Sequence, residues 1–352
     1  EFRRVLFRSE GIKVFRSWIF VRKSSAIFFR LMNYFSFVFS SLLLGIIKLK
    51  KYDIIICESP PLFLGISAVI LARLKKSKLV FNVSDLWPES AKKLGLITNK
   101  YILELTEKLE LFIYRKSKIV TGQTQGIIKS INLRAPSVKT HLYRNGINTM
   151  SLVVQEVKSN WKVENIFNEN DFVLFYGGNI SYSQGLDVIL RAAQLLTHIP
   201  NIKFVLQGNG PEKERLIKLK EELKLENVFF FPPVSKMKMN EILPQIDAGI
   251  IPLKKLDLFL GAIPSKIFEY FVHSKPILLG VDGEARELFV DEGKCSLYFT
   301  PENHEELAEK VIQLYNNPEL GKELGRAGNL FVHERFDIEM IVKEFHKVLK
   351  SL

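Results

Sequence analysis

The chain has 352 residues, which is long for one α/β domain and suits two. Lys and Arg number 50 and Asp and Glu 38, so the net charge of +12 favours an anionic partner such as a diphosphate or an anionic lipid. We find no nucleic-acid-binding motif and expect no nucleic acid partner. The chain has two cysteines, Cys57 and Cys295, which exclude a disulfide framework and a cysteine-based metal cluster. We expect no metal and no cofactor.

The first residues match no element that the pattern allows us to place. A doubly wound domain opens with a strand, a glycine-rich turn and a helix, and none of these precedes the apolar stretch Leu31–Ile47. We therefore expect the first domain to be incomplete at its start. Residues 1–9 are expected to be foreign to the protein or to have no place in its fold.

The stretch Leu31–Ile47 is almost entirely apolar and has basic residues on both sides, among them Arg30 and Lys48. It falls slightly short of the roughly 20 apolar residues of a spanning helix. Three interpretations stay open: a buried crossover helix of the first domain, which we favour, a helix lying on a membrane face, and a transmembrane span. The flanking positive charge and the nearby Trp18 support the second.

Two sets of short apolar runs alternate with stretches of helical periodicity, which predicts parallel βαβ units in two α/β domains. The runs are Asp53–Cys57, Leu79–Val83 and Lys118–Thr121, and then Phe172–Tyr176, Lys203–Leu206, Val228–Phe231, Ala248–Ile251 and Pro276–Leu279. A polar linker, 151–170, separates the two sets. We expect one domain over 10–155, a second over 170–332, and over 333–352 an amphipathic helix, for which a return to the first domain is one possibility.

A polar segment follows the run Leu79–Val83. Asp85 and Glu89 carry carboxylates, which accept hydrogen bonds from sugar hydroxyls, and Trp87 between them is able to stack on a sugar face. Because ligands of open α/β sheets bind beyond the carboxyl ends of the strands, this position fits a sugar site. The same residues fit a helix start equally well, with Ser84 or Asp85 as N-cap and Glu89 in the first turn.

Two glycine turns follow strands of the second set. Gly178 comes after its first strand, and Gly208 and Gly210 come after its second. Glycine lets the backbone approach a ligand closely, and the helix after each turn offers N–H groups to a phosphate. A plain βα turn explains either one alone, but two turns at the same sheet edge point to a phosphate site.

The segment Gly261–Tyr270 predicts a helix start with a lysine in its first turn. Pro264 suits that turn, and Ser265 and Lys266 then lie at the N-terminal end. The helix dipole disfavours a cation there unless an anion is bound, so Lys266 is a candidate diphosphate ligand. Glu269 lies three residues on and on the same side, where its carboxylate is able to accept from ribose hydroxyls. The alternative is an exposed Lys–Glu pair.

Four motifs together resemble the retaining glycosyltransferases with the GT-B fold of glycosyltransferase family 4. Within that family they are similar to the bacterial O-antigen and capsule enzymes of the L-fucosamine-transferase type. The motifs are Asp85–Ser90, Gly178–Leu186, Gly208–Pro211 and Pro264–Tyr270. The resemblance runs from about residue 10 to the end. It implies an α/β fold of two facing Rossmann-like domains with parallel sheets, the second binding the nucleotide sugar and the first the acceptor.

The resemblance also assigns roles to single residues. Glu269 corresponds to the second acid of the family's paired-glutamate motif and holds the ribose, while Lys266 neutralises the leaving diphosphate. Asp85 is the candidate contact for the acceptor hydroxyl, with Glu89 as an auxiliary residue. The predicted donor site is Gly178, Asn179, Gln184, Gly208, Gly210, Pro264, Ser265, Lys266 and Glu269.

The chain departs from the family pattern at three positions. Gly261 stands where the first glutamate of the pair is expected, and Asn179 and Gln184 stand where the family has Arg and Lys. The diphosphate clamp therefore lacks two positive charges. Arg144, next to Asn145, is the candidate that compensates for them.

The resemblance implies an enzyme that moves a hexosyl or N-acetylamino sugar from a UDP-sugar to a lipid-linked saccharide, with retention, in O-antigen or capsule synthesis. The UDP-sugar is a substrate and not a cofactor. We expect a cytoplasmic protein bound peripherally to the inner face of the cell membrane. Two other functions stay open: a UDP-sugar epimerase of the related two-domain kind, which forms product without an acceptor, and a non-catalytic fragment that binds a nucleotide sugar.

Overall fold

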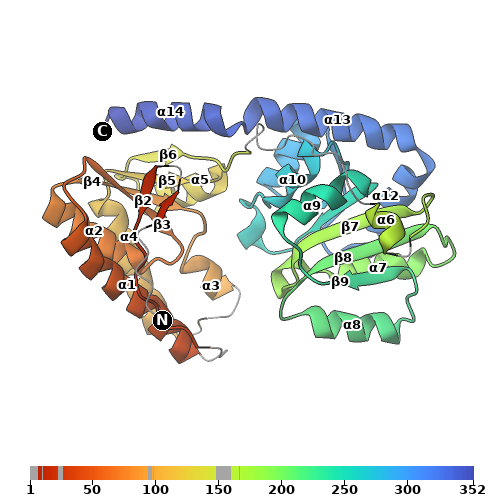
Figure 1. Cartoon of the computed structure of the whole chain (residues 1–352), viewed down its shortest axis with the longest axis horizontal. Helices are drawn as coiled ribbons and strands as arrows, with labels where there is room; N and C mark the ends of the chain where they lie inside the picture. The colour runs from red at the N-terminus through yellow and green to blue at the C-terminus, as the bar shows by residue number, and fades with distance from the viewer. Residues whose placement is uncertain are drawn as a thin grey trace. The chain divides into compact units, whose positions relative to one another are not determined.

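The structure is a computed structural model that describes residues 7–9, 11–22, 27–93, 97, 99–147, 160–165 and 167–352 (Figure 1). The chain divides into two compact units. Unit 1 comprises Glu1–Arg144 and Glu344–Leu352, and unit 2 comprises Asn145–Lys343. Each unit is built on one parallel β-sheet, and the two are described separately below.

Unit 1 has a sheet of four parallel strands in the order β3-β4-β5-β6. One face packs against helices through fully buried side chains such as Phe81, Ile113 and Val120. The elements in chain order are β1 (Phe7–Ser9), β2 (Ile12–Val14), α1 (Ile27–Lys48), β3 (Ile54–Ser59), α2 (Leu64–Lys75), β4 (Lys78–Val83), α3 (Glu89–Lys93), α4 (Lys100–Lys116), β5 (Ile119–Gly122), α5 (Gln125–Arg134) and β6 (Thr140–Leu142).

Unit 2 has a sheet of six parallel strands in the order β12-β11-β10-β7-β8-β9. Its helical elements are α6 (Trp161–Glu164), η2 (Tyr182–Gln184), α7 (Asp187–Leu195), α8 (Lys213–Glu222), α9 (Lys236–Ile242), η3 (Leu243–Gln245), η4 (Asp257–Phe259), α10 (Lys266–Val272), α11 (Glu284–Arg286), η5 (Glu287–Glu292), α12 (His304–Asn316), α13 (Pro318–Arg335) and α14 (Ile338–Lys350). Its strands are β7 (Phe172–Asn179), β8 (Ile202–Asn209), β9 (Val228–Phe231), β10 (Ala248–Pro252), β11 (Ile277–Gly280) and β12 (Ser296–Tyr298). The last residues of α14, from Glu344 on, belong to unit 1.

Both faces of the unit 2 sheet are buried. In β7 and β8, Leu174 and Phe204 point to one core, and Phe175 and Val205 point to the other. A strand covered on both faces needs apolar side chains at successive positions. That is why these strands read as continuous apolar runs in the sequence.

The strand order of unit 2 creates a switch point between β7 and β10. The chain runs from β7 outward through β8 to β9, then returns to the other side of β7 and continues through β10, β11 and β12. In open parallel sheets ligands bind beyond the carboxyl ends of the strands at such a point. The candidate site of unit 2 is therefore at the ends of β7, β8 and β10.

The predicted α/β fold with parallel sheets is confirmed. All eight predicted strands exist, as β3, β4 and β5 in unit 1 and β7 to β11 in unit 2. The pattern did not reveal β1, β2, β6 and β12, which have only three residues each and therefore show no periodicity of their own.

The structure bears on two local expectations. Residues 7–9 form β1, which pairs antiparallel with β2; residues 1–6 lie outside the described residues, and the expectation that residues 1–9 are foreign to the protein stays a prediction. Of the expected linker 151–170, the part 151–159 also lies outside them. The remainder contains the short helix α6, because Trp161 is buried against Phe167 and Phe175.

Helix α1 contains the apolar stretch Leu31–Ile47. The Ser67 hydroxyl of α2 donates to the carbonyl of Val38 at 2.7 Å, and Gly45 lies against Leu71, so one side of α1 packs on α2. Only 11% of the window Leu31–Lys48 is buried, and this window is long and apolar enough to cross a membrane. The favoured expectation of a buried core helix is therefore wrong for this structure.

Candidate functional site

The site of unit 2 forms around the ammonium group of Lys266, the first residue of α10. Its Nζ donates a hydrogen bond to Oε1 of Gln184 at 2.9 Å and lies 4.2 Å from the ring centroid of Tyr176. A Cβ atom added to Gly178 would stand 3.4 Å from the same Nζ. Three residues predicted to bind the donor, Gly178, Gln184 and Lys266, are thus brought together from β7, η2 and α10.

Tyr176 completes this group, although no pattern in the sequence pointed to it. Its hydroxyl donates to the carbonyl of Asn179 at 2.6 Å and lies 3.1 Å from Oε1 of Gln184. The ring under Lys266 stabilises the ammonium by a cation–π contact. Tyr176 and Gln184 therefore fix the direction of the lysine side chain.

The electrostatics of Lys266 favour an anionic ligand. Burial lowers the pKa of Lys266 to about 8, and the nearby carboxylate of Glu269 only partly opposes this. The hydrogen bond of Lys266 Nζ goes to Gln184, and among the described side chains no ion pair within 4.0 Å joins Lys266 to Glu269, so the structure does not show the alternative of a simple Lys–Glu pair. A phosphate beside Nζ would stabilise the ammonium form, which burial alone disfavours.

Tyr270 holds α10 against the sheet and thereby places Lys266. The backbone N–H of Gly177 donates to the Tyr270 hydroxyl at 3.0 Å, and that hydroxyl lies 3.3 Å from the carbonyl of Phe175. The ring lies on β10, where a Cβ on Gly249 would come within 2.4 Å of it. The helix is thus attached to both strands that border the switch point.

The glycine turns have a packing role that the sequence did not show. Gly178 and Gly208 have φ angles of +140° and +153°, a region that L-residues rarely adopt. A Cβ on Gly208 would stand 1.9 Å from the carbonyl oxygen of Gly178, and one on Gly210 would stand 2.2 Å from that of Ile180. Gly208 and Gly210 are therefore required by the contact between the two turns, and only Gly178 borders Lys266.

Pro264, Ser265 and Glu269 flank the lysine. Ser265 is the N-cap of α10 without a side-chain capping bond, and the carbonyls of Pro264 and Ser265 accept the first backbone N–H groups of the helix. Desolvation raises the pKa of the Glu269 carboxyl, against the opposing charges of Lys236 and Lys266. A carboxylate in this environment gains from hydrogen-bond donors such as ribose hydroxyls.

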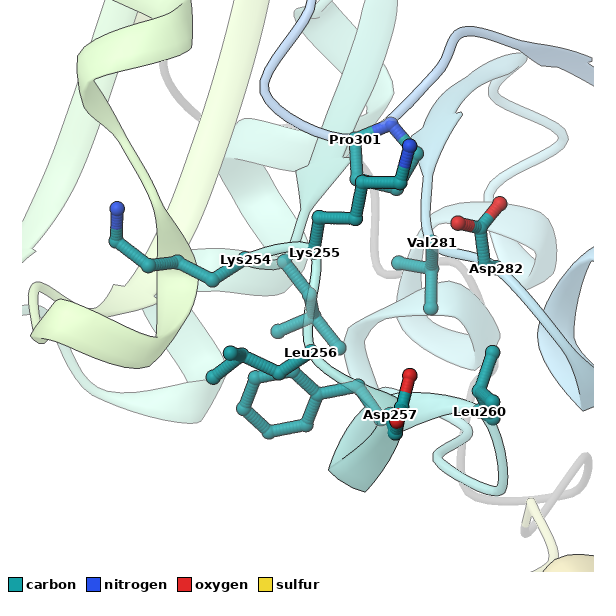
Figure 2. Close-up of a pocket in the computed structure, with 10 residues that line it drawn as sticks. Lys254, Lys255, Leu256, Asp257, Leu260, Val281, Asp282 and Pro301 are labelled. Atoms are coloured by element: carbon teal, nitrogen blue, oxygen red, sulfur yellow. The ribbon is translucent and has the colours of Figure 1, made fainter. Parts of the chain in front are cut away.

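A small pocket lies at the ends of β10 and β11 (Figure 2). Lys254 and Asp282 are on opposite sides of it, and Lys254 Nζ forms an ion pair with Glu302 at 2.8 Å. The backbone N–H of Lys254 donates to the carbonyl of Ser183, which places one wall of the pocket beside η2. The sequence did not predict this pocket, because its lining comes from separate loops: Leu253, Lys254, Lys255, Leu256, Asp257, Phe259, Leu260, Val281, Asp282 and Pro301.

The predicted residues of unit 1 have local partners. Asp85 accepts from the Ser90 hydroxyl at 2.5 Å, and Glu89, the first residue of α3, forms an ion pair with Lys93 at 2.7 Å. These contacts are those expected of a helix start. Arg144 is the last residue of the first part of unit 1, and Asn145 is the first of unit 2. The binding roles of Asp85, Glu89, Arg144 and Asn145 stay predictions.

Comparison with known proteins agrees with this geometry. Residues 157–331, most of unit 2, match the family model of the glycosyl transferases group 1. A putative colanic acid biosynthesis glycosyl transferase of Escherichia coli (strain K12), WcaI, is 25% identical over 268 residues. The match covers 74% of this chain and 65% of that relative, so the chain spans less than two thirds of the relative's length.

Two solved structures share the fold. Sucrose-phosphate synthase from Thermosynechococcus elongatus superimposes with a TM-score of 0.79 at 15% identity, covering 99% of this chain and 85% of that one. HepE from Anabaena, solved in complex with UDP-glucose, gives a TM-score of 0.72 at 17% identity, covering 90% of this chain and 82% of that one.

The two parallel sheets and these likenesses define the class of the protein as one with the GT-B fold. Within that class, unit 2 is similar to the glycosyl transferases group 1 over residues 157–331.

Proposed function

We propose that the chain transfers a sugar from a UDP-sugar to a lipid-linked saccharide, with retention, in the synthesis of a cell-surface polysaccharide. The observation that carries the proposal is Lys266, held by Gln184 and Tyr176 beside Gly178 at the switch point of unit 2. Two findings support it: HepE, which shares the fold, was solved with UDP-glucose, and the Escherichia coli relative is named for colanic acid biosynthesis.

In this proposal Lys266 binds the diphosphate and Glu269 accepts from the ribose hydroxyls. The bond between the anomeric carbon and the diphosphate oxygen breaks, and a bond from that carbon to the acceptor oxygen forms on the same face. The acceptor proton passes to the departing UDP. Lys266 stabilises the negative charge that grows on the diphosphate as the bond breaks, in a site where water is partly excluded.

Asn179 and Gln184, which stand where the family has Arg and Lys, act differently from basic residues. Gln184 accepts a hydrogen bond from Lys266 through Oε1, so it orients the lysine and adds no charge. Asn179 contributes its backbone carbonyl to Tyr176, which extends the same support. More of the diphosphate's stabilisation therefore rests on Lys266 and on backbone N–H groups than in a relative with Arg and Lys at these positions.

The test is a panel of UDP-sugars with bacterial membrane lipid as acceptor, with the product followed by mass spectrometry. Lys266→Ala should lower turnover by about 100-fold or more while leaving the melting temperature nearly unchanged. Lys218→Ala, at an exposed lysine of α8, is the matched control and should keep full turnover. Near-normal turnover in Lys266→Ala contradicts the phosphate role. Product without an acceptor would support an epimerase, and UDP binding without any product would support a binding module.

We also propose that unit 1 docks peripherally on the inner, cytoplasmic face of the cell membrane through α1. Four apolar side chains at intervals of four residues form one exposed stripe, with 45% to 74% of each side chain accessible: Phe35, Phe39, Leu43 and Ile47. The adjacent segment is held against α1, since Ser36 and Asn33 bond to the backbone of Phe20. Its exposed Trp18 extends the apolar surface.

The charge at the ends of the stripe fits an anionic lipid surface. Lys48 ends α1, Lys50 and Lys51 follow it, and all three are exposed. Arg16 and Arg22 are exposed on the adjacent segment. An apolar stripe flanked by basic residues is typical of a helix that lies in the headgroup region.

Vesicle flotation tests the docking. We expect binding to phosphatidylglycerol-containing vesicles, weaker binding to pure phosphatidylcholine, and loss of binding in the double variant Phe39→Ser/Ile47→Ser. Leu105→Ser is the control, because Leu105 is equally exposed on α4. Flotation that the double variant does not reduce would rule the surface out, and resistance to carbonate would indicate a span instead.

A further inference from the structure

A hydrogen-bonded polar network lies at the carboxyl edge of the unit 1 sheet. The amide of Asn82 donates to Oε2 of Glu58 at 2.6 Å, and the Ser84 hydroxyl donates to its Oε1. Behind them, Thr121 donates to the side-chain carbonyl of Asn82, and Gln123 donates to the Ser84 hydroxyl. Both oxygens of the Glu58 carboxylate are thus held from the end of β4, by Asn82 and by Ser84, the residue after that strand. These two are held in turn from the end of β5, by Thr121 and by Gln123, the residue after that strand.

The network is in register across three adjacent strands. Glu58 of β3 pairs with Asn82 of β4, and Asn82 pairs with Thr121 of β5. Side chains in register on parallel strands share one face of the sheet. These three residues therefore form a row directed at the same face.

The same face changes from apolar to polar along the strands. Val80 and Ile119, two positions before Asn82 and Thr121, are fully buried and pack with Phe345. Asn82 and Thr121 are also buried, yet they are polar. Buried polar groups destabilise a fold unless they are hydrogen-bonded. Here Thr121 donates to Asn82 and Asn82 donates to Glu58, so this series of hydrogen bonds ends at Glu58.

Glu58 itself is exposed, unlike the residues that orient it. A carboxylate has about four acceptor positions, and the network uses two of them. The remainder face solvent at the edge where ligands of parallel sheets bind. An oriented carboxylate with free acceptor positions selects a ligand that donates hydrogen bonds.

The neighbourhood favours hydroxyl groups over a cation. Within the described parts of the chain, no group of three or more His, Cys, Asp or Glu side chains gathers that would hold a metal ion. Ile56 precedes Glu58 by two positions, on the same face, and is 53% exposed. An exposed apolar side chain beside a fixed carboxylate matches a sugar ring, which presents C–H groups next to hydroxyls.

We propose that this edge of unit 1 is a saccharide-binding site in which Glu58 accepts hydrogen bonds from sugar hydroxyls, with Asn82 and Ser84 as its positioning residues. That the saccharide is the acceptor of a transfer reaction rests on the function proposed above. Glu58 differs from Asp85 in its surroundings: Asp85 bonds to Ser90, five residues on, whereas Glu58 of β3 is held by Asn82 and Ser84 at the end of the neighbouring strand β4.

The experiment uses the full chain, labelled and applied to an array of oligosaccharides from bacterial surface polysaccharides, with UDP titrated separately by calorimetry. Glu58→Gln keeps the size of the side chain but removes the charge, and we expect at least a tenfold loss of array binding. Ser84→Ala should cause a smaller loss, of a few-fold. Both variants should bind UDP as the wild type does. Glu104→Gln, at an exposed glutamate of α4, should change neither readout.

The inference is overturned if Glu58→Gln binds the array as tightly as the wild type, or if the wild type binds no saccharide on it. Melting temperatures of the variants show whether a loss reflects unfolding. If UDP fails to bind the wild type while saccharides bind in a Glu58-dependent way, the proposed transfer fails and the saccharide site stands.

Discussion

The affinity of the chain for UDP should fall as the pH rises through about 8. The cause is Lys266, whose pKa burial lowers to about 8. In the complex the diphosphate lies beside Nζ and stabilises the ammonium form, so the pKa of the bound lysine rises. Above pH 8 the free protein is mostly neutral at this position, and binding then requires the uptake of a proton.

The size of the effect follows from the protonated fraction of the free lysine. With a pKa of about 8, roughly nine in ten free molecules carry the charge at pH 7 and roughly one in eleven at pH 9. If only the charged form binds well, Kd rises about tenfold between these values, or about 1.4 kcal/mol. The phosphate's own last proton is lost at about pH 6, so the charge of UDP does not change over this range.

Calorimetry in two buffers of different ionisation enthalpy measures both the Kd of UDP and the number of protons taken up on binding. At pH 8 we expect about half a proton to be taken up for each UDP bound. The control is Lys266→Arg, because arginine stays charged throughout and its UDP affinity should be flat from pH 7 to 9. The reasoning is refuted if the UDP affinity of the wild type does not change between pH 7 and 9. It is also refuted if the UDP affinity of Lys266→Arg falls as steeply as that of the wild type.

Two further predictions concern stability. Gly208→Ala should lower the free energy of unfolding by about 3 kcal/mol or more, because the new Cβ would stand 1.9 Å from the carbonyl oxygen of Gly178 and the φ of +153° is unfavourable. Gly321 lies in α13, where a new Cβ would stand 3.7 Å from its nearest neighbour outside the helix backbone. Gly321→Ala should therefore leave the free energy of unfolding unchanged or raise it by up to about 1 kcal/mol. Equal urea midpoints for the two variants would contradict the packing of the turns. Glu110→Gln should destabilise unit 1 by about 3 kcal/mol, since the fully buried Glu110 binds both terminal nitrogens of Arg134 at 2.6 and 2.9 Å. A loss below about 1 kcal/mol in chemical denaturation would show that this pair is not needed.

The sequence could predict the strands of unit 2 because both faces of that sheet are buried. Runs such as Phe172–Tyr176 are apolar at every position, and that pattern follows from burial on both faces. The position of Lys266 at a helix start was equally readable, because Pro264 and the following periodicity mark the boundary. These are local properties, and the local sequence determines them.

The exposure of α1 could not be read in the same way. The sequence of an apolar helix does not show whether protein or lipid covers it. Only the tertiary structure shows that α2 packs against one side of α1 while Phe39 and Ile47 stay exposed on the other. The buried interpretation failed for this reason.

The network at Glu58 was missed because its members are far apart in the chain. Asn82 lies 24 positions from Glu58, and Thr121 lies 39 from Asn82. The pairing of β3, β4 and β5 brings them into one row. The only signal in the sequence was a polar residue at the end of each apolar run, and such residues are common where strands end.

By itself, the sequence determined the α/β class, eight of the strands and the placement of Lys266 at a helix start, because periodicity and helix boundaries depend on residues close together in the chain. The tertiary structure decided what the lysine contacts. Gln184 lies 82 positions from Lys266, and the Tyr270 hydroxyl meets the backbone 93 positions away at Gly177. The parallel order of the strands brings these groups to one sheet edge, and burial at that edge lowers the pKa of the lysine.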